Sequence, residues 1–461
     1  MANRVQREEL IPSAARLLSS LRDLGYDFVN AVADLIDNSI AANAGRVDVT
    51  IKFDGEDSWV RIADDGEGMS TGMISEAMRL GSGTRDYGDT DLGKFGLGLK
   101  TASLSQARRI TVASRTDPKR RTLDCRILDL DDVVARDKWE IIHPAAIDRP
   151  SEAVSPLQDT TGTVVVWTNL DRVLSRKDPF GGWAQRHLLN LAERLDVHLG
   201  MVFERFITGQ AQRRKKLTIT INGTKVEPWD PFCTNERTEH LPERELPVGG
   251  SIVKWRPFVL PPQRDFSDDE AWRRASGPRQ WNNQQGLYIY RADRMIQSGG
   301  WSWLRGVDEH VKLARAGLFF YPSLDDAFEI NISKMRVKLP DDLREQLKPL
   351  VSFLTKRADE RYRISGRKDR PPAPPMPPPR TGSGGGGGTA FPPRPAPGGP
   401  TPAPPTGSGK PTPQPPTFPR IPEAGDAISR AARAVGAEEA LKQIRKELAK
   451  NDAQVAYDLG W

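Results

Sequence analysis

Two carboxylates and an amide on one predicted helix form the first candidate site. Asp34, Asp37 and Asn38 occur in the run Asp-Leu-Ile-Asp-Asn-Ser-Ile, and the apolar residues around them predict a helix with a polar stripe. A spacing of four residues puts Asp34 and Asn38 one turn apart on the same face. A carboxylate can accept a proton from water, and an amide oxygen is a hard ligand for Mg²⁺. A polar stripe of this kind is also typical of a solvated helix surface.

A second motif combines a carboxylate with a glycine turn at the end of a predicted strand. The run from Ile62 to Met69 reads Ile-Ala-Asp-Asp-Gly-Glu-Gly-Met. Asp64 could accept a hydrogen bond from an exocyclic amine, and Gly66 and Gly68 would let a ligand approach the backbone. Asp-Gly turns after strands are common, so this motif alone identifies no ligand.

A third motif is rich in glycine and precedes a predicted helix. Residues 92–100 read Leu-Gly-Lys-Phe-Gly-Leu-Gly-Leu-Lys, with glycines at positions 93, 96 and 98. Bare backbone N–H groups and the positive end of a helix dipole suit phosphate oxygens. No strand–helix–strand unit surrounds the motif, which disfavours a dinucleotide-binding fold. Residues 81–90, just before it, have the composition of a mobile flap.

The elements that must position these motifs predict an α+β sandwich. Helices are expected from Pro12 to Leu24 and from Tyr26 to Ile40, and strands at 47–53, 59–63, 110–114, 123–128 and 163–168. We expect the helices to cover one face of a largely antiparallel sheet. A second α/β region would begin with a hairpin at 217–226, followed by strands at 251–259, 286–290 and 317–321 and helices at 301–305 and 341–363.

The three motifs in this order closely resemble the Bergerat fold of the GHKL superfamily, which includes gyrase B, heat-shock chaperones, histidine kinases and MutL. A Gly-Thr strand at 161–166 adds a fourth element. The resemblance implies binding of ATP and Mg²⁺, with Asp34 as the general base, Asn38 as the Mg²⁺ ligand and Asp64 at the adenine amine. It places Gly66, Gly68, Met69 and Thr163 beside the base, and it places Gly93, Lys94, Phe95, Gly96, Leu97, Gly98, Leu99 and Lys100 at the phosphate end of the ATP lid.

The residue at position 34 departs from the superfamily, which usually has Glu there. Asp34 is one methylene shorter, so its carboxylate falls about 1.5 Å short. Misplacement on this scale can lower a rate about a hundredfold. Asp37 is an alternative base. We therefore expect slow turnover, or ATP binding that serves mainly as a switch.

Within the superfamily the chain most resembles bacterial MORC-type and MutL-like proteins. The resembling stretches are 35–39, 96–103 and 286–296, and the last is similar to the transducer domain that follows the ATPase in those proteins. In such a domain a lysine reaches the γ-phosphate. The resemblance assigns this role to Lys334 in preference to Lys338, although either lysine could instead end a strand and face water.

Composition divides the chain of 461 residues. Residues 371–420 contain 20 prolines and 10 glycines, which predicts a segment without a packed core. Residues 1–200 carry 26 Lys and Arg against 31 Asp and Glu, so the overall charge of +6 does not come from the first domain. The expected domains are an ATPase domain at 1–209, a transducer-like domain at 210–365, a linker at 366–421 and a helical segment at 422–461, which would dock either on the body or on a partner.

Several classes of protein are disfavoured. Two cysteines without a Cys-x-x-Cys motif exclude a disulfide framework and a thiolate zinc site, and no apolar run predicts a membrane span. All five histidines follow the first three motifs, so a phosphoacceptor helix before the ATPase is excluded. We expect a cytoplasmic ATPase that acts as an ATP-gated, homodimeric clamp in DNA transactions or in genome or phage defence. DNA, through basic residues 213–216 or through Arg363 and residues 367–370, and an effector protein at the C-terminal helices are candidate partners. The alternative is a binding module that uses ATP without rapid hydrolysis.

Overall fold

The computed structural model describes residues 12–23, 26–80, 98–119, 123–174, 180–330, 337–368 and 438–451. Its N-terminal region, residues 14–225, is built on a seven-stranded sheet with the order β4-β3-β5-β2-β1-β6-β7. The strands are β1 (Arg46–Lys52), β2 (Trp59–Asp64), β3 (Arg109–Arg115), β4 (Asp124–Asp129), β5 (Gly162–Thr168), β6 (Thr218–Ile221) and β7 (Thr224–Lys225). Neighbouring strands are antiparallel except for β1 and β6.

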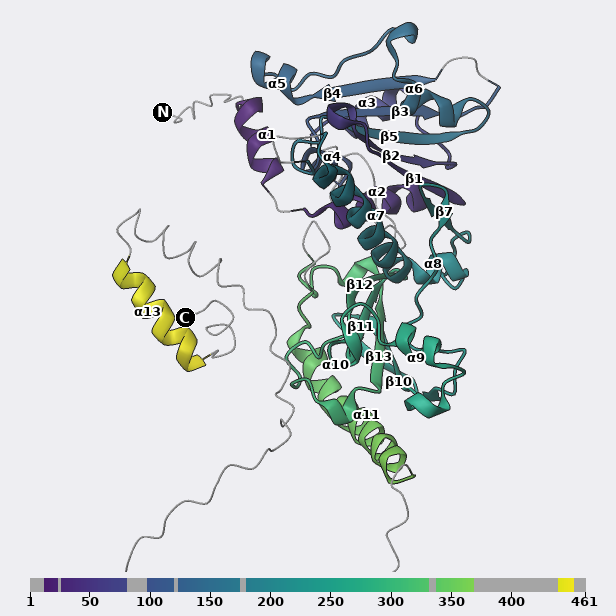
Figure 1. Ribbon diagram of the computed structural model, residues 1–461, viewed down its shortest axis with the longest axis vertical. Coiled ribbons are helices and arrows are strands. Elements are labelled where there is room, and N and C mark those ends of the chain that lie inside the picture. The colour runs from purple at the N-terminus through teal and green to yellow at the C-terminus, as the bar shows by residue number, and fades with distance from the viewer. Residues whose placement is uncertain are drawn as a thin grey trace, which may run out of the picture. The chain divides into compact units, whose positions relative to one another are not determined.

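Helices cover one face of this sheet (Figure 1). They are α1 (Ala14–Arg22), α2 (Phe28–Ala41), α4 (Gly98–Leu104), α7 (Gly182–Val202) and α8 (Glu204–Thr208). Ser13 and Asp27 cap α1 and α2 by accepting hydrogen bonds from backbone N–H groups of the first turn. Alternate strand residues such as Val60, Ile62 and Trp167 point into the core under these helices. The α+β sandwich expected from the sequence is therefore confirmed.

The opposite face of the sheet carries a smaller apolar cluster. The alternate residues Ala63, Val164 and Val166 pack there against Ala153 of α6 (Ser151–Val154) and Leu157. Helices thus lie on both faces, whereas the sequence predicted them on one. The short helices α3 (Thr71–Met78) and α5 (Leu130–Arg136) complete the N-terminal region.

The hairpin at 217–226 belongs to the N-terminal sheet. Its strand β6 pairs in parallel with β1, and Leu217, Ile219 and Ile221 are buried in the same core as α2. The sequence pattern identified the hairpin but assigned it to the second region, because local alternation does not tell which sheet a strand joins. The expected domain boundaries remain predictions.

The middle region, residues 239–368, has a six-stranded sheet with the order β12-β11-β13-β10-β8, and β9 also pairs with β10. The strands are β8 (Glu239–His240), β9 (Arg244–Val248), β10 (Ser251–Val259), β11 (Gly286–Arg291), β12 (Arg294–Ser298) and β13 (Ala314–Phe320). Helices α9 (Asp269–Ala275), α10 (Gln280–Gln284) and α11 (Asp341–Lys368) accompany it. All six residues of β11 are buried, so this strand is the centre of the second core.

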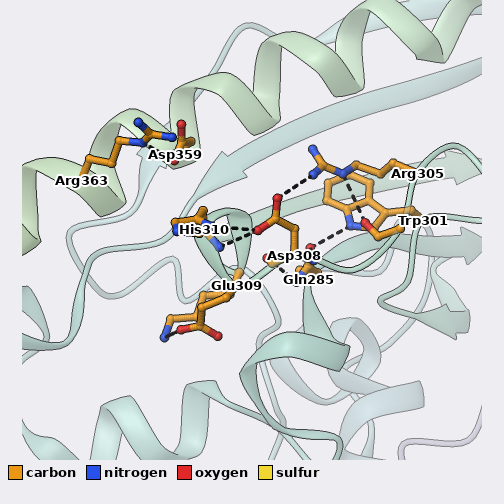
Figure 2. Close-up of polar contacts among 10 residues, drawn as sticks. Gln285, Trp301, Arg305, Asp308, Glu309, His310, Asp359 and Arg363 are labelled. Atoms are coloured by element: carbon orange, nitrogen blue, oxygen red, sulfur yellow. Dashed lines mark hydrogen bonds and ion pairs between the residues drawn. The ribbon is translucent and has the colours of Figure 1, made fainter. Parts of the chain in front are cut away.

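The helix predicted at 301–305 is wrong. Ser302 and Trp303 have φ angles of 46° and 66°, which a right-handed helix does not allow. Hydrogen bonds to Gln285 hold the loop instead: Trp301 donates from Nε1 at 3.0 Å and the backbone N–H of Asp308 at 3.2 Å. Figure 2 shows these contacts and the Asp308 carboxylate between Arg305 and His310.

Helix α13 (Glu438–Asn451) is described by itself, because residues 375–461 form a separate unit. Among the residues that the structure describes, no helix has the length and apolar character needed to cross a bilayer. The first three residues of the predicted linker, 366–368, belong to α11, and the rest of the linker and most of the predicted lid lie outside the described residues.

Candidate functional site

The first candidate residues lie on α2 against the seven-stranded sheet. Asp34 is 3% exposed and Asp37 is 1% exposed, whereas Asn38 is exposed. The helix is apolar on most sides, so its two carboxylates are carried into the core together with Leu35 and Ile36. Buried carboxylates are costly unless they are paired, so these two side chains must have partners.

Both carboxylates have partners close by. The Tyr26 hydroxyl donates to Asp34 Oδ2 at 2.9 Å, while Arg294 Nη2 lies 3.4 Å from Asp34 Oδ1. Arg294 Nε also forms an ion pair with Asp37 Oδ1 at 2.8 Å. Burial, and next the nearby Asp34 charge, raise the pKa of Tyr26, so this phenol stays a hydrogen-bond donor.

A half-buried histidine, His198, lies near the same arginine. Burial, and next the charge of Arg294, lower the pKa of His198 to about 4. The imidazole is therefore neutral near pH 7 and adds no second positive charge beside Arg294. The guanidinium also lies 5.8 Å from the centre of the Phe203 ring, where a cation is favoured.

Asp64 ends β2 and is held from three directions. The backbone N–H groups of Gly66 and Thr163 donate to Oδ1 at 3.0 Å and 3.1 Å, and the Ser39 hydroxyl donates to Oδ2 at 2.9 Å. Burial raises the pKa of Asp64, and these three hydrogen bonds oppose that rise. The residue remains partly accessible, so an acceptor oxygen with a fixed direction is presented beside the turn.

The turn after Asp64 needs its glycines. Gly68 has a φ of +70°, and a Cβ there would lie 2.2 Å from the Arg115 carbonyl oxygen. A Cβ on Gly66 would lie 2.7 Å from the carbonyl oxygen of Ala42 at the end of α2. The glycines therefore allow the turn to pack directly against α2 and β3, which brings the second motif beside the first.

Met69 and Thr163 are joined by a serine on β3. Ser114 Oγ accepts a hydrogen bond from the Met69 backbone N–H at 2.7 Å and lies 3.0 Å from Thr163 Oγ1. Ser114 also donates to the Gly162 carbonyl at 2.9 Å. The second and fourth sequence motifs are thus brought together at neighbouring strands β2, β3 and β5.

Only the last part of the third motif lies within the described residues. Gly93, Lys94, Phe95, Gly96 and Leu97 lie outside them, as does Lys334. Gly98 begins α4, Leu99 is half-buried, and Lys100 is 1% exposed with its Nζ donating to the Arg79 carbonyl.

Lys100 points into the protein in this structure. Burial lowers its pKa to about 8, although the nearby Glu76 charge opposes the shift. Its predicted contact with a phosphate stays a prediction.

Sequence reasoning missed three of the contacts made by the candidate carboxylates. Tyr26, Ser39 and Arg294 were not singled out, although Ser39 lies next to Asn38 in the first motif. Tyr26 lies before the Asp27 cap, outside α2, so helix periodicity does not place it beside Asp34. Arg294 lies 260 residues away, so only the fold brings it to the site.

Residues 26–163 match the model of a family described as histidine kinase-, DNA gyrase B- and HSP90-like ATPases. This stretch is a GHKL ATPase domain. It contains α2, the Asp64 turn and α4, and it ends at Thr163, the second residue of β5, so the first three sequence motifs fall within the match and the fourth begins at its end. A domain of this family implies ATP binding. A search of the curated proteins found no match for the chain.

Proposed function

We propose that the chain binds ATP and Mg²⁺ in its GHKL domain and hydrolyses the nucleotide slowly, as an ATP-gated clamp. The observation that carries this proposal is the partly accessible Asp64 carboxylate, fixed by Gly66, Thr163 and Ser39 beside the helix that bears Asp34. One carboxylate is available to recognise a base, and the other is available to act on water.

At the adenine end, Asp64 would accept a hydrogen bond from the exocyclic amine. Its Oδ1 is already fixed by two backbone donors, so the carboxylate cannot rotate freely. Met69 is half-buried beside it and would supply apolar contact to the base. Thr163 and Ser114 offer hydroxyl groups to a bridging water.

The residues at the other end fit a bound Mg²⁺. Asn38 has an exposed amide one turn after Asp34, and Mg²⁺ typically combines one or two protein oxygens with phosphate oxygens and water. The described residues include no group of three or more His, Cys, Asp or Glu that could hold a metal by themselves. Mg²⁺ at Asn38 would neutralise charge on the phosphates.

Hydrolysis would use Asp34 as the group that orients and deprotonates water. The water oxygen forms a bond to the γ-phosphorus, the bond from that phosphorus to the bridging oxygen breaks, and the proton from water passes to the Asp34 carboxylate. Tyr26 holds one oxygen of this carboxylate at 2.9 Å. Lys334 is proposed to contact the γ-phosphate from the transducer-like region, with Lys338 as the alternative.

The proposal also covers dimerisation and partner binding by the whole chain. A MORC-type or MutL-like protein would dimerise through its ATPase domains when ATP binds, and it would act in the cytoplasm on DNA or in genome or phage defence. Arg213, Lys215 and Lys216 are exposed cations that could contact phosphates, whereas Arg214 donates to the Ile40 carbonyl at 3.2 Å.

A second candidate function is supported by the identity and burial of Asp34. The side chain is shorter than Glu and both of its oxygens have partners, so it has little freedom to follow a substrate. In that case ATP would act as a conformational ligand, and the C-terminal helices, including α13 with its exposed Ile444, would recruit an effector protein.

The rate of phosphate release and the mass of the protein in solution distinguish the clamp from the switch. We would compare the wild type with Asp34→Asn and Asn38→Ala, and measure mass with and without a non-hydrolysable ATP analogue. The clamp predicts turnover that both substitutions reduce and a dimer that needs the analogue. Turnover equal in wild type and Asp34→Asn, with dimerisation retained, would favour the switch. Absence of nucleotide binding would overturn both.

DNA binding has its own test. Neutralising Arg213, Lys215 and Lys216 should weaken binding to duplex DNA and reduce its salt dependence. The matched control neutralises Lys254, Lys348 and Lys356, three exposed cations of the middle region that lie in neither basic cluster. Equal binding by the two triple variants would rule out the 213–216 cluster.

A further inference from the structure

The turn between β11 and β12 carries residues of the middle region into the N-terminal core. Ala292 is 8% exposed and belongs to the apolar cluster formed by α2, α7 and the first sheet. The Asp293 carboxylate accepts hydrogen bonds from Arg205 Nε at 2.7 Å and from the Gln212 backbone N–H at 2.8 Å. The tip of this hairpin is therefore held by residues of the other region.

The backbone of the turn is strained. Ala292 and Asp293 have φ angles of 45° and 68°, in the left-handed region that residues with a side chain rarely adopt. Glycine would adopt this conformation at lower cost. The contacts of Asp293 and the burial of the Ala292 methyl group help to hold the turn in this shape, so the position of the next residue is well defined.

That next residue is Arg294, which lies between the two carboxylates of α2. Its side chain is 4% exposed, and the paired side chains of Asp34 and Asp37 are 3% and 1% exposed. A guanidinium keeps its charge in such a place, and its planar fork can contact two acceptors at once. Two carboxylates one turn apart would repel each other without a cation between them.

The carboxylate of Asp34 thus has a partner in each region. Tyr26, from the GHKL domain, donates to Oδ2, and Arg294, from the middle region, contacts Oδ1. By contrast, the three groups that donate hydrogen bonds to Asp64 within the described residues all come from the N-terminal region. The orientation of the proposed base therefore depends on the middle region, whereas the adenine end does not.

We infer that Arg294 is a positioning residue that lets the middle region set the orientation of Asp34 for hydrolysis. The inference rests on the proposed role of Asp34 and adds a residue that no sequence motif of the ATPase domain contains. It makes hydrolysis, but not nucleotide binding, depend on how the β11–β12 hairpin is docked. Movement of the hairpin would change turnover without changing the adenine site.

The same hairpin offers a matched control. Arg291, three residues earlier, forms a buried ion pair with Asp325 at 2.6 Å, and the two side chains are 2% and 4% exposed. This pair lies wholly within the middle region. Arg291→Met and Arg294→Met therefore each remove a buried guanidinium from one hairpin, and only the second removes a contact to α2.

The experiment measures kcat for ATP and the dissociation constant of a non-hydrolysable analogue in the full chain. Arg294→Met should lower kcat about a hundredfold, the scale expected for a misplaced catalytic group, while the affinity for the analogue changes less than about threefold. Arg294→Lys should recover about tenfold of the loss, because it keeps the charge but not the fork. Arg291→Met should keep kcat within about threefold of wild type.

A charge-balanced variant protects the test against misfolding. Arg294→Met combined with Asp37→Asn removes one charge of each sign, so the net charge of the cluster stays as in wild type while the contact to Asp34 is lost. It should unfold at a higher temperature than Arg294→Met alone and still show the low kcat.

The outcomes distinguish this inference from the function on which it rests. Turnover near the wild-type rate in both Arg294 variants would overturn the inference and leave the ATPase intact. Equal losses of kcat in Arg291→Met and Arg294→Met would also overturn it, because they would show a general loss of structure. A wild type that binds ATP without any turnover would overturn both the inference and the proposed hydrolysis.

Discussion

The two ends of the candidate nucleotide site are built differently. At the adenine end, Asp64 is held by Gly66, Thr163 and Ser39, all from the N-terminal region. At the phosphate end, Asp34 is held by Tyr26 and by Arg294, and the second of these comes from the other sheet. One carboxylate is oriented locally and the other across two regions.

This difference separates binding from turnover. Recognition of the base would need only the fold of residues 26–163, the stretch that matches the ATPase family. Correct placement of the proposed base also needs a hairpin more than a hundred residues further along the chain. A protein built in this way could hold ATP in one state and hydrolyse it only when its middle region is docked.

The largest effect is expected at the phosphate end. Asp34→Asn removes the proton acceptor but keeps the size of the side chain, so kcat should fall by about 10²–10⁴-fold while analogue affinity changes little. Phosphate release and an analogue titration would measure the two quantities. Asp27→Asn is the control, because Asn also caps a helix and Asp27 lies on the same helix. A kcat unaffected by Asp34→Asn would exclude this carboxylate as the base.

The next effect is expected at the adenine end. In Asp64→Asn the amide oxygen must accept from Gly66 and Thr163, which turns the NH₂ group toward the donor on adenine. Loss of a charged hydrogen bond should lower ATP affinity by about 10–100-fold. Asp65→Asn is a matched control, since its Oδ1 accepts from the Gly45 and Arg46 N–H groups at 2.8 Å and Asn can replace it. Equal affinities for ATP in the two variants would show that Asp64 does not recognise adenine.

The junction between the two regions should show a pH-dependent stability. Burial, and next the charge of Asp230, raise the pKa of Glu204 to about 8, and Tyr290 of β11 donates to its Oε1 at 3.1 Å. Because the unfolded carboxyl ionises near pH 4.5 and the folded one near 8, this contribution is complete below about pH 4.5 and is lost as the pH rises through about 8.

Glu204→Gln should remove that dependence. The wild type should lose on the order of a few kcal/mol of stability between pH 5 and 8.5 relative to the variant, as measured by denaturant unfolding. Taking the difference between the two proteins cancels the opposite effect of His198, whose pKa is lowered to about 4. Parallel stability curves for wild type and variant would contradict a neutral Glu204 at the junction.

The smallest effect is expected from Ser39. Ser39→Ala removes one of the three hydrogen bonds to Asp64, which should cost about 0.5–1.5 kcal/mol of ATP binding, or a few-fold in affinity. Ser39 also donates to the Leu35 carbonyl one turn earlier, at 3.3 Å. Ser20→Ala is the control, because Ser20 donates to the Arg16 carbonyl in the same way, at 3.1 Å, but lies on α1. An affinity loss no larger than that of the control would show that Ser39 does not orient Asp64.

Much of the N-terminal region could be predicted because its helices and strands are indicated by residues close together in the sequence. The Asp27 cap and the apolar periodicity indicate α2, and alternation indicates β1 to β5 within a residue or two. Gly66 and Gly68 could be linked to a ligand turn, although the closeness of Ala42 and Arg115 that requires them appears only in the structure.

The rest depended on contacts between residues far apart in the chain. The hairpin at 217–226 was recognised, but its parallel partner β1 lies about 170 residues earlier. Residues 301–305 were predicted to form a helix, whereas hydrogen bonds from Trp301 and Asp308 to Gln285 hold them in a loop. No sequence pattern predicted that Arg294 would contact the carboxylates of α2, since an arginine after a turn normally faces water.

The affinity for ATP, measured side by side in Asp64→Asn and Arg294→Met, tests the separation of the two ends most directly. The account predicts a loss of about 10–100-fold in Asp64→Asn and less than about threefold in Arg294→Met, since Ser39, Gly66 and Thr163, which donate to Asp64, all lie in the N-terminal region. Similar losses of affinity in the two variants would contradict it.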